Sequence, residues 1–135
     1  MIVKIKIKLY YHSMKSPIIG ITLDFENNGG YSKFPWYAIR ENYLSCLYKY
    51  GAIPFPLFHE TTINSSLLKI LDGLVITGGN FDINPELYAE NDSGSRNIKD
   101  KRTKFEIDIF RKFLETTKPI RGICGGQQLM NVACG

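Results

Sequence analysis

Short apolar runs alternate with segments of helical periodicity along this chain, and that alternation limits its possible folds more than any other feature. The apolar or β-branched runs predict strands at residues 18–23, 53–57, 74–77 and 119–123. Helical spacing predicts helices at residues 36–50, 64–71, 100–115 and 127–133. Strands that alternate with helices pair in parallel through right-handed crossovers. The sequence therefore predicts an α/β fold with a doubly wound, mainly parallel sheet and flanking helices, in the flavodoxin-like three-layer arrangement.

Several local signals refine this prediction. Pro54 and Pro56 remove two ladder donors, so the strand at 53–57 is expected near a sheet edge. Cys46 falls on the apolar stripe of the helix at 36–50, which favours a core position. The polar segment 78–99 is long for a loop in a compact domain, and such length is typical of a functional or mobile loop.

The N-terminal residues are expected to form an extension, residues 1–16, followed by a single domain at 17–135. Residues 1–11 alternate apolar side chains with Lys4, Lys6 and Lys8, which favours an edge strand with one charged face. The alternative is that translation starts at Met14 and that the extension is dispensable. The sequence leaves both interpretations open.

Composition excludes several classes of protein. The net charge is +4, but beyond the extension the basic residues are scattered among acids, so nucleic-acid binding is not expected. Three cysteines, at positions 46, 124 and 134, form no regular disulfide framework, which suits a reducing cytoplasm. No apolar stretch approaches the roughly 18 residues of a membrane span, and no signal peptide is recognisable. No cofactor or metal site is predicted.

The strongest chemical signal is the G-x-C-x-G sequence at residues 122–126, at a predicted strand-to-helix junction. This pattern is typical of a nucleophile elbow, here with Cys124 as the nucleophile. Glycines are needed because side chains two residues either side would collide with neighbouring backbone. The following helix N-terminus presents free N–H groups and partial positive charge, which favour a thiolate and can hold an oxyanion. The alternative is that Cys124 is a small buried apolar residue beside a glycine-rich turn.

Three segments resemble the class I glutamine amidotransferase-like hydrolases, and among them the γ-glutamyl-γ-aminobutyrate hydrolase (peptidase C26) group. Residues 122–132 resemble that family's G-I-C-x-G-x-Q-x-x-N-V nucleophile motif, and residues 71–88 resemble its L-D-G…G-G-x-x-D-x-x-P-x-x-Y loop. The third segment, residues 102–106, is similar to an R-D-x-x-E motif, although Thr103 replaces the aspartate. The group commonly carries arginine where this chain has Gly125, which affects the expected substrate preference within the family.

The resemblance implies that Cys124 attacks a γ-glutamyl amide or glutamine, with the N–H groups of Gly79 and Gly125 as the oxyanion hole. It also implies that Gln128 contacts the glutamyl group of the substrate, whereas Gln127 is expected on the helix surface.

The family supplies its general base from a His-x-Glu pair well downstream of the elbow, and we expect this chain to be truncated before it. His12 and His59 both precede the elbow and are expected at the surface. Negligible amidase activity is therefore expected for the chain alone. Several hypotheses stay open: an enzyme completed by a separately encoded C-terminal half, a non-functional remnant of a disrupted gene, a non-catalytic γ-glutamyl-binding module, and a thiol redox role for Cys124.

Overall fold

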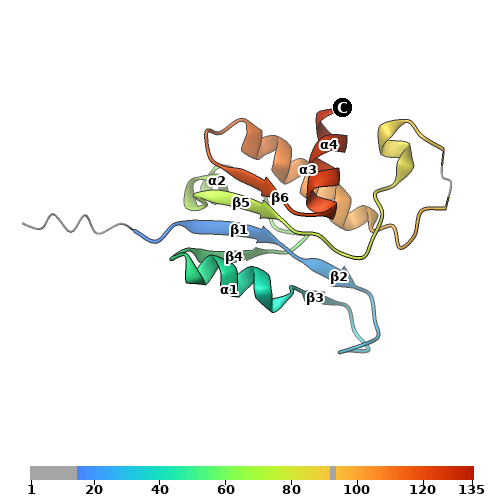
Figure 1. The fold of residues 1–135 in the computed structure, drawn as a ribbon, viewed down its shortest axis with the longest axis horizontal. Coiled ribbons are helices and arrows are strands. Elements are labelled where there is room, and N and C mark those ends of the chain that lie inside the picture. The colour runs from blue at the N-terminus through green and yellow to red at the C-terminus, as the bar shows by residue number, and fades with distance from the viewer. Residues whose placement is uncertain (1–14, 92–93) are drawn as a thin grey trace, which may run out of the picture.

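A four-stranded parallel sheet forms the centre of the protein, in a computed structural model that describes residues 15–91 and 94–135 (Figure 1). Its strands are β1 (Ile18–Thr22), β4 (Ile53–Leu57), β5 (Gly73–Ile76) and β6 (Ile120–Gly122), in the order β4-β1-β5-β6. Every pair within this sheet is parallel, as the alternation of strands and helices predicts. The strand proposed at residues 1–11 and His12 lie outside the described residues.

Two short strands, β2 (Asp24–Glu26) and β3 (Trp36–Ala38), form a separate antiparallel hairpin after β1. The prediction that a helix begins at residue 36 is therefore wrong at its start, since α1 runs from Glu41 to Lys49. Aromatic residues pair well across strands, and the Phe25 ring packs at a tilt against Tyr37, with ring centroids 5.1 Å apart. This cross-strand contact stabilises residues 36–38 as a strand, although the spacing of their apolar residues predicts a helix.

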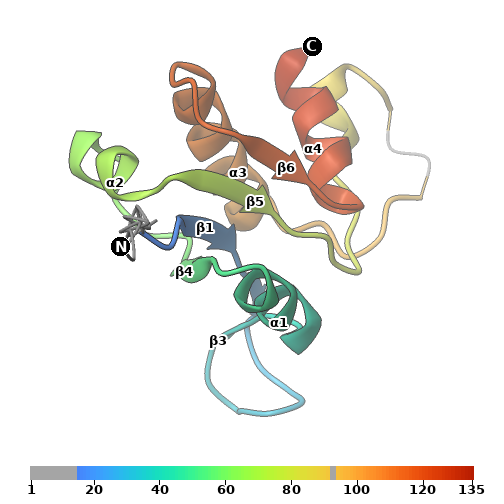
Figure 2. The same ribbon diagram turned by 60° about the vertical axis from the view of Figure 1, so that its left-hand side comes forward.

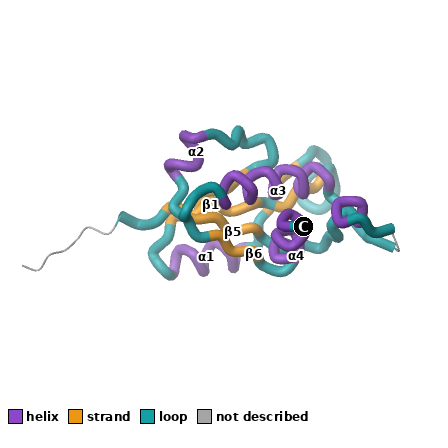
Figure 3. Tube along the Cα trace, turned by 90° about the horizontal axis from the view of Figure 1, so that it is seen from above, coloured by secondary structure: helices purple, strands orange, loops and turns teal. Residues whose placement is uncertain are grey.

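Helices cover both faces of the parallel sheet. The helix α1 lies on one face, and α2 (Ser65–Ile70) and α3 (Asp100–Leu114) lie on the other (Figures 1 and 3). The last helix, α4 (Gly125–Cys134), packs against β6 and α3, as the turned view also shows (Figure 2). None of the described helices is long and apolar enough to cross a bilayer.

The main core lies between the sheet and the helices α2 and α3. Fully buried members include Leu74, Ile109, Phe113 and Leu129. The opposite face is less well covered, and α1 has no buried residue. Cys46 is therefore exposed, contrary to the core position expected from its stripe, because α1 packs at the edge strand β4 and only part of its apolar stripe is covered.

The proline-containing strand β4 is an edge strand, as predicted. The Ile53 N–H points inward and donates to the Pro17 carbonyl. Backbone direction alternates along a strand, so Pro54 and Pro56 lie at positions that point away from β1. The prolines thus remove donors only on the outer side, where no ladder is formed.

The loop between β5 and α3 contains a short 3₁₀ helix, η1 (Pro85–Tyr88), that the sequence reading did not predict. Asn84 caps it by accepting a hydrogen bond from the Glu86 N–H at 3.1 Å. The Asn84-Pro85 pair is a recognisable start signal, with a cap followed by proline at the first helical position.

Candidate active site

Cys124 lies in the tight turn between β6 and α4, with an exposed side chain. Its backbone has φ 52° and ψ −113°, a conformation that residues with a Cβ rarely adopt. Strained backbone of this kind clusters at functional sites and persists only when the surrounding structure enforces it. The turn places the thiol at the N-terminus of α4, at the carboxyl end of the parallel strands.

The glycines around Cys124 are required by space. A Cβ at Gly122 would lie 2.6 Å from Met130 Sδ and 2.7 Å from the Gly126 carbonyl carbon. A Cβ at Gly126 would lie 2.2 Å from the Ile76 carbonyl oxygen, far inside contact distance. The predicted reason for the glycines, collision with neighbouring backbone, therefore agrees with the geometry.

The carboxyl end of β5 lies directly against this turn. A Cβ built on Gly78 would lie 2.9 Å from Cys124 Cβ and 3.5 Å from its Sγ. The Gly78 N–H donates to the Tyr43 hydroxyl at 3.2 Å. By contrast, among the described residues no hydrogen-bond acceptor faces the N–H of Gly79 or of Gly125. Gly79 directly follows Gly78 and Gly125 directly follows Cys124, so both peptide units lie close to this turn; Gly125 is buried and Gly79 is half-buried.

Two hollows are each lined by a residue predicted for the site, although Cys124 lines neither of them. One of about 220 Å³ is lined by Asp24, Arg40, Tyr43 and the Thr77–Gly79 segment, among others. Another of about 400 Å³ is lined by Gln128 together with Asp82, Tyr88 and Asn131. Gln128 lies in the first turn of α4, where its N–H donates to the Cys124 carbonyl at 3.2 Å and its side chain is exposed. Gln127 is exposed as well, as expected.

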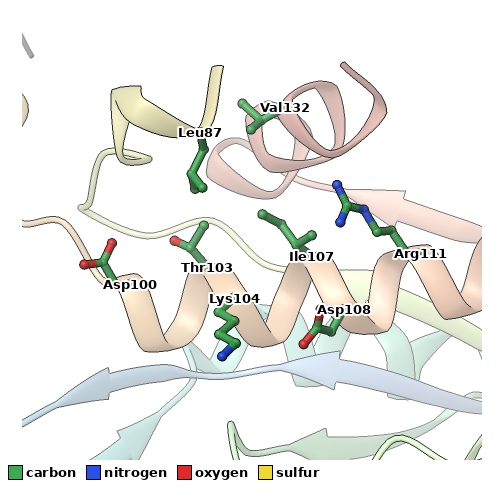
Figure 4. A pocket seen from close by; sticks show the side chains of 8 residues that line it. All are labelled: Leu87, Asp100, Thr103, Lys104, Ile107, Asp108, Arg111 and Val132. Atoms are coloured by element: carbon green, nitrogen blue, oxygen red, sulfur yellow. The ribbon is translucent and has the colours of Figure 1, made fainter. Parts of the chain in front are cut away.

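A third hollow, of about 410 Å³, lies between α3, η1 and α4 (Figure 4). Leu87, Ile107 and Val132 supply its apolar side, and charged residues of α3 such as Lys104 and Arg111 lie along the helix below. It contains none of the residues predicted to bind substrate or to react.

A buried charged cluster lies beneath the end of β5, and the sequence reading did not assign it to the site. The Arg102 side chain is fully buried, and its Nε lies 3.0 Å from Glu106 Oε1, one helical turn along α3. Its Nη1 lies 3.1 Å from Asp24 Oδ1, and its guanidinium stacks over the Phe81 ring at 4.2 Å. Arg102 and Glu106 are the two ends of the segment that resembles the R-D-x-x-E motif, and their four-residue spacing on a helix predicts that the two side chains can pair.

The acids of this cluster respond differently to their surroundings. Burial raises the pKa of Glu106 to about 7, and the adjacent Arg102 charge opposes that rise. Burial also acts to raise the pKa of Asp24, but hydrogen bonds from Lys99 and Phe25 and the charges of Arg102 and Lys99 outweigh it and lower that pKa. Lys99 contacts Asp24 at 2.8 Å and Glu26 at 2.7 Å, which ties α3 to β2.

His59 is buried, and the expectation that it lies at the surface is wrong. Its Nε2 donates to the Leu23 carbonyl at 3.1 Å, because a carbonyl oxygen can only accept. Its ring packs against Tyr37 at 5.0 Å and Phe105 at 5.7 Å. His59 follows β4, whereas Cys124 follows β6, at the opposite edge of the sheet. With about 4.8 Å between neighbouring strands, the two edges lie roughly 14 Å apart, so His59 is not placed to serve Cys124.

Within residues 15–91 and 94–135, no three His, Cys, Asp or Glu side chains are grouped so that they could ligate a metal ion.

Comparison with known proteins relates the whole described domain to one family. The peptidase C26 family model matches residues 17–135. A glutamine amidotransferase-like protein of Rickettsia prowazekii is 40% identical over 122 residues, which are 87% of this chain and 43% of that protein. A similarly named protein of Lactococcus lactis subsp. cremoris is 33% identical over 123 residues, or 87% of this chain and 65% of the relative.

The γ-glutamyl-γ-aminobutyrate hydrolase of Escherichia coli K12 is 30% identical over 125 residues, which are 90% of this chain and 48% of that enzyme. The chain therefore spans about half the length of the curated relatives it matches. Together with the parallel sheet and the strand-turn-helix around Cys124, the match over residues 17–135 shows that this chain belongs to the peptidase C26 family.

Proposed function

We propose that this chain carries the nucleophile of a cysteine-dependent γ-glutamyl amide hydrolase or glutaminase, with Cys124 as the attacking thiol. The observation that carries the proposal is the backbone at Cys124, a positive φ of 52° in a turn where neighbouring atoms leave no room for a Cβ at Gly122 or Gly126. Such a turn exposes the side chain at a helix N-terminus. The family relationship supports amide chemistry at this position.

In the proposed reaction the Cys124 thiolate attacks the γ-carbonyl carbon, and the carbonyl π electrons move to oxygen. The oxyanion accepts hydrogen bonds from Gly79 and Gly125, whose N–H groups have no acceptor among the described residues. One donor of this kind can lower the barrier by about 3 kcal/mol. The oxyanion then collapses, the amine leaves with a proton, and a thioester remains. Water hydrolyses the thioester to release glutamate and the thiol.

Gln128 is proposed to contact the glutamyl group, because it lines a hollow one helical turn from the nucleophile. The thiol proton and the leaving amine both need a general base and acid. His59 lies at the other edge of the sheet and is held by Leu23, so it does not supply one. We therefore propose that the base comes from residues outside the described part of this chain, on the same or another polypeptide.

The experiment measures hydrolysis of glutamine and of γ-glutamyl-γ-aminobutyrate by the purified chain, alone and after co-expression with the polypeptide encoded immediately downstream. Cys124→Ala is compared with Cys134→Ala, because Cys134 is an exposed cysteine on the same helix. We expect negligible turnover by the chain alone, since loss of one triad member costs about three or more powers of ten. We expect turnover with the complementing polypeptide that disappears in Cys124→Ala and persists in Cys134→Ala.

Each other outcome argues for a different hypothesis. Equal activity in Cys124→Ala would refute the nucleophile assignment. Saturable binding of a γ-glutamyl compound without turnover in either preparation would favour a binding module. An aggregating chain that neither binds nor turns over substrate would favour the remnant of a disrupted gene.

A further inference from the structure

Arg102 holds the end of β5 from below. Its Nη2 donates to the Thr77 carbonyl at 2.7 Å, to Thr77 Oγ1 at 3.1 Å and to the Gly78 carbonyl at 3.3 Å. A single guanidinium group therefore fixes two successive carbonyl groups immediately before Gly79. Three contacts from one buried side chain to one loop restrict the loop far more than a surface contact could.

The guanidinium group is itself held in place from three sides. Glu106 accepts from its Nε at 3.0 Å, Asp24 lies 3.1 Å from its Nη1, and Phe81 covers its face at 4.2 Å. Arg102 and Glu106 are almost completely removed from solvent. The side chain has no room to adopt another rotamer without leaving a charge unpaired in the core, which is strongly unfavourable.

The two hydrogen bonds to carbonyl groups also determine where the following N–H groups point. The C=O and N–H of a trans peptide unit point in opposite directions. Because the Thr77 carbonyl faces Arg102, the Gly78 N–H points away from it and reaches the Tyr43 hydroxyl of α1. Because the Gly78 carbonyl also faces Arg102, the Gly79 N–H points away from α3 and is left without an acceptor among the described residues.

We infer that Arg102, oriented by Glu106 and Asp24, is a positioning residue that aims the Gly79 N–H for oxyanion binding. It acts through the peptide between Gly78 and Gly79 and does not touch the reacting atoms. This inference rests on the proposed function, since it assigns Arg102 a role only if Gly79 serves Cys124. Lysine cannot replace arginine here, because an ammonium group lacks the planar fork that contacts Glu106 and both carbonyls together.

The test compares two electrophiles at Cys124. 6-Diazo-5-oxonorleucine carries its ketone where glutamine has the amide carbonyl; a new sulfur–carbon bond forms, dinitrogen leaves, and the thiol proton ends on the former diazo carbon. Methyl methanethiosulfonate has no carbonyl group; the thiolate attacks its divalent methylthio sulfur, the sulfur–sulfur bond of the reagent breaks, and methanesulfinate leaves as a methyl disulfide forms on the cysteine. Peptide mapping by mass spectrometry measures both rates at Cys124, with the exposed Cys46 and Cys134 as internal references.

For Arg102→Lys we expect the ratio of the diazoketone rate to the thiosulfonate rate at Cys124 to fall about tenfold or more. The thiosulfonate rate itself should stay within about twofold, because the thiol keeps its own surroundings. Arg111→Lys, on the exposed side of the same helix, should leave the ratio unchanged. Glu106→Gln keeps the size of the side chain and an acceptor for Arg102, so it should lower the same ratio by a smaller factor. If Arg102→Lys does not fold, Glu106→Gln tests the positioning role of Arg102.

The result separates the two proposals. In the wild type, the ratio of the diazoketone rate to the thiosulfonate rate is expected to be higher at Cys124 than at Cys46 and Cys134. An equal ratio at all three cysteines would overturn the proposed function, and this inference with it. A wild-type preference that survives in folded Arg102→Lys, or in Glu106→Gln when the first variant is unfolded, would overturn the role of Arg102 alone.

Discussion

Gly126 makes the closest approach to neighbouring backbone among the glycines of the Cys124 turn. Its missing Cβ would overlap the Ile76 carbonyl oxygen, which belongs to β5 and cannot move without disturbing the centre of the sheet. At Gly125 a Cβ would meet the Phe81 ring at 3.3 Å and would lie 3.8 Å from the Gly78 Cα, an ordinary contact distance. A side chain is therefore tolerated far better at Gly125 than at Gly126.

We expect Gly126→Ala to lower the free energy of unfolding by about 2 kcal/mol or more, through overpacking. This loss should occur although alanine is favoured over glycine within a helix by about 1 kcal/mol. Gly125→Ala is the matched control and should cost much less. Urea unfolding of both variants measures the difference, and equal stability of the two would contradict the close packing of Gly126 on β5.

His59 introduces a pH dependence of stability. Burial, followed by the charges of Arg102 and Lys101, lowers its pKa below the ordinary 6.5, while the Leu23 carbonyl and Glu60 act in the opposite direction. As the pH falls below about 6.5, the unfolded chain binds a proton that the folded chain resists. The stability that neutral His59 provides is thus present at neutral pH and decreases as the pH falls.

Wild type should therefore lose more stability between pH 7.5 and pH 5 than His59→Gln, which cannot titrate. The difference in slope cannot exceed about 1.4 kcal/mol per pH unit, the value for one proton. Denaturant unfolding at a series of pH values measures both slopes. Parallel curves for the two proteins would show that His59 titrates as it does in the unfolded chain.

The sequence could indicate Cys124 and the glycines around it, because their requirements are local: a tight turn imposes them on adjacent residues. It could not place His59 or Arg102, whose surroundings come from segments far apart in the chain. A histidine after a proline-rich strand is usually exposed, and only the hairpin and α3 together close over His59. Likewise, Arg102 becomes a buried contact of Thr77 only once α3 docks on β5.

Among the elements, α3 contributes most of the buried aromatic surface. It presents Phe105, Ile109 and Phe113 to the sheet, while Leu114 at its end is 55% exposed. The helical spacing of its apolar residues predicted the helix within one residue of its observed end. The hairpin was missed for the opposite reason, since cross-strand aromatic pairing is invisible to a pattern read along a single segment.

Truncation of α3 side chains should separate buried from exposed positions. Ile109→Ala should lower the free energy of unfolding by about 2–5 kcal/mol, because it leaves a cavity in the core. Leu114→Ala removes a similar volume from an exposed position and should cost well under about 1 kcal/mol. Chemical denaturation compares the two, and a small effect at Ile109 would mean that α3 does not pack on the sheet as described.

For the whole molecule, the alternation of strands and helices predicted a parallel sheet with helices on both faces, and the observed sheet confirms that prediction. The strand order β4-β1-β5-β6 was not part of the prediction. Which face is better covered did not follow, because it depends on how much of each helix finds a partner. The core lies mainly on the face of α2 and α3, and α1 stays half-covered on the other.

The prolines of β4 give the sheet two unlike borders. A strand lying beside β4 would receive no backbone hydrogen bond from Pro54 or Pro56, since neither has a hydrogen to give. β6, at the other border, contains no proline, so its outward amides can pair with an arriving strand. Backbone pairing with a further strand, from the same polypeptide or another, is therefore more favourable at the β6 border, beside Cys124, than at the β4 border.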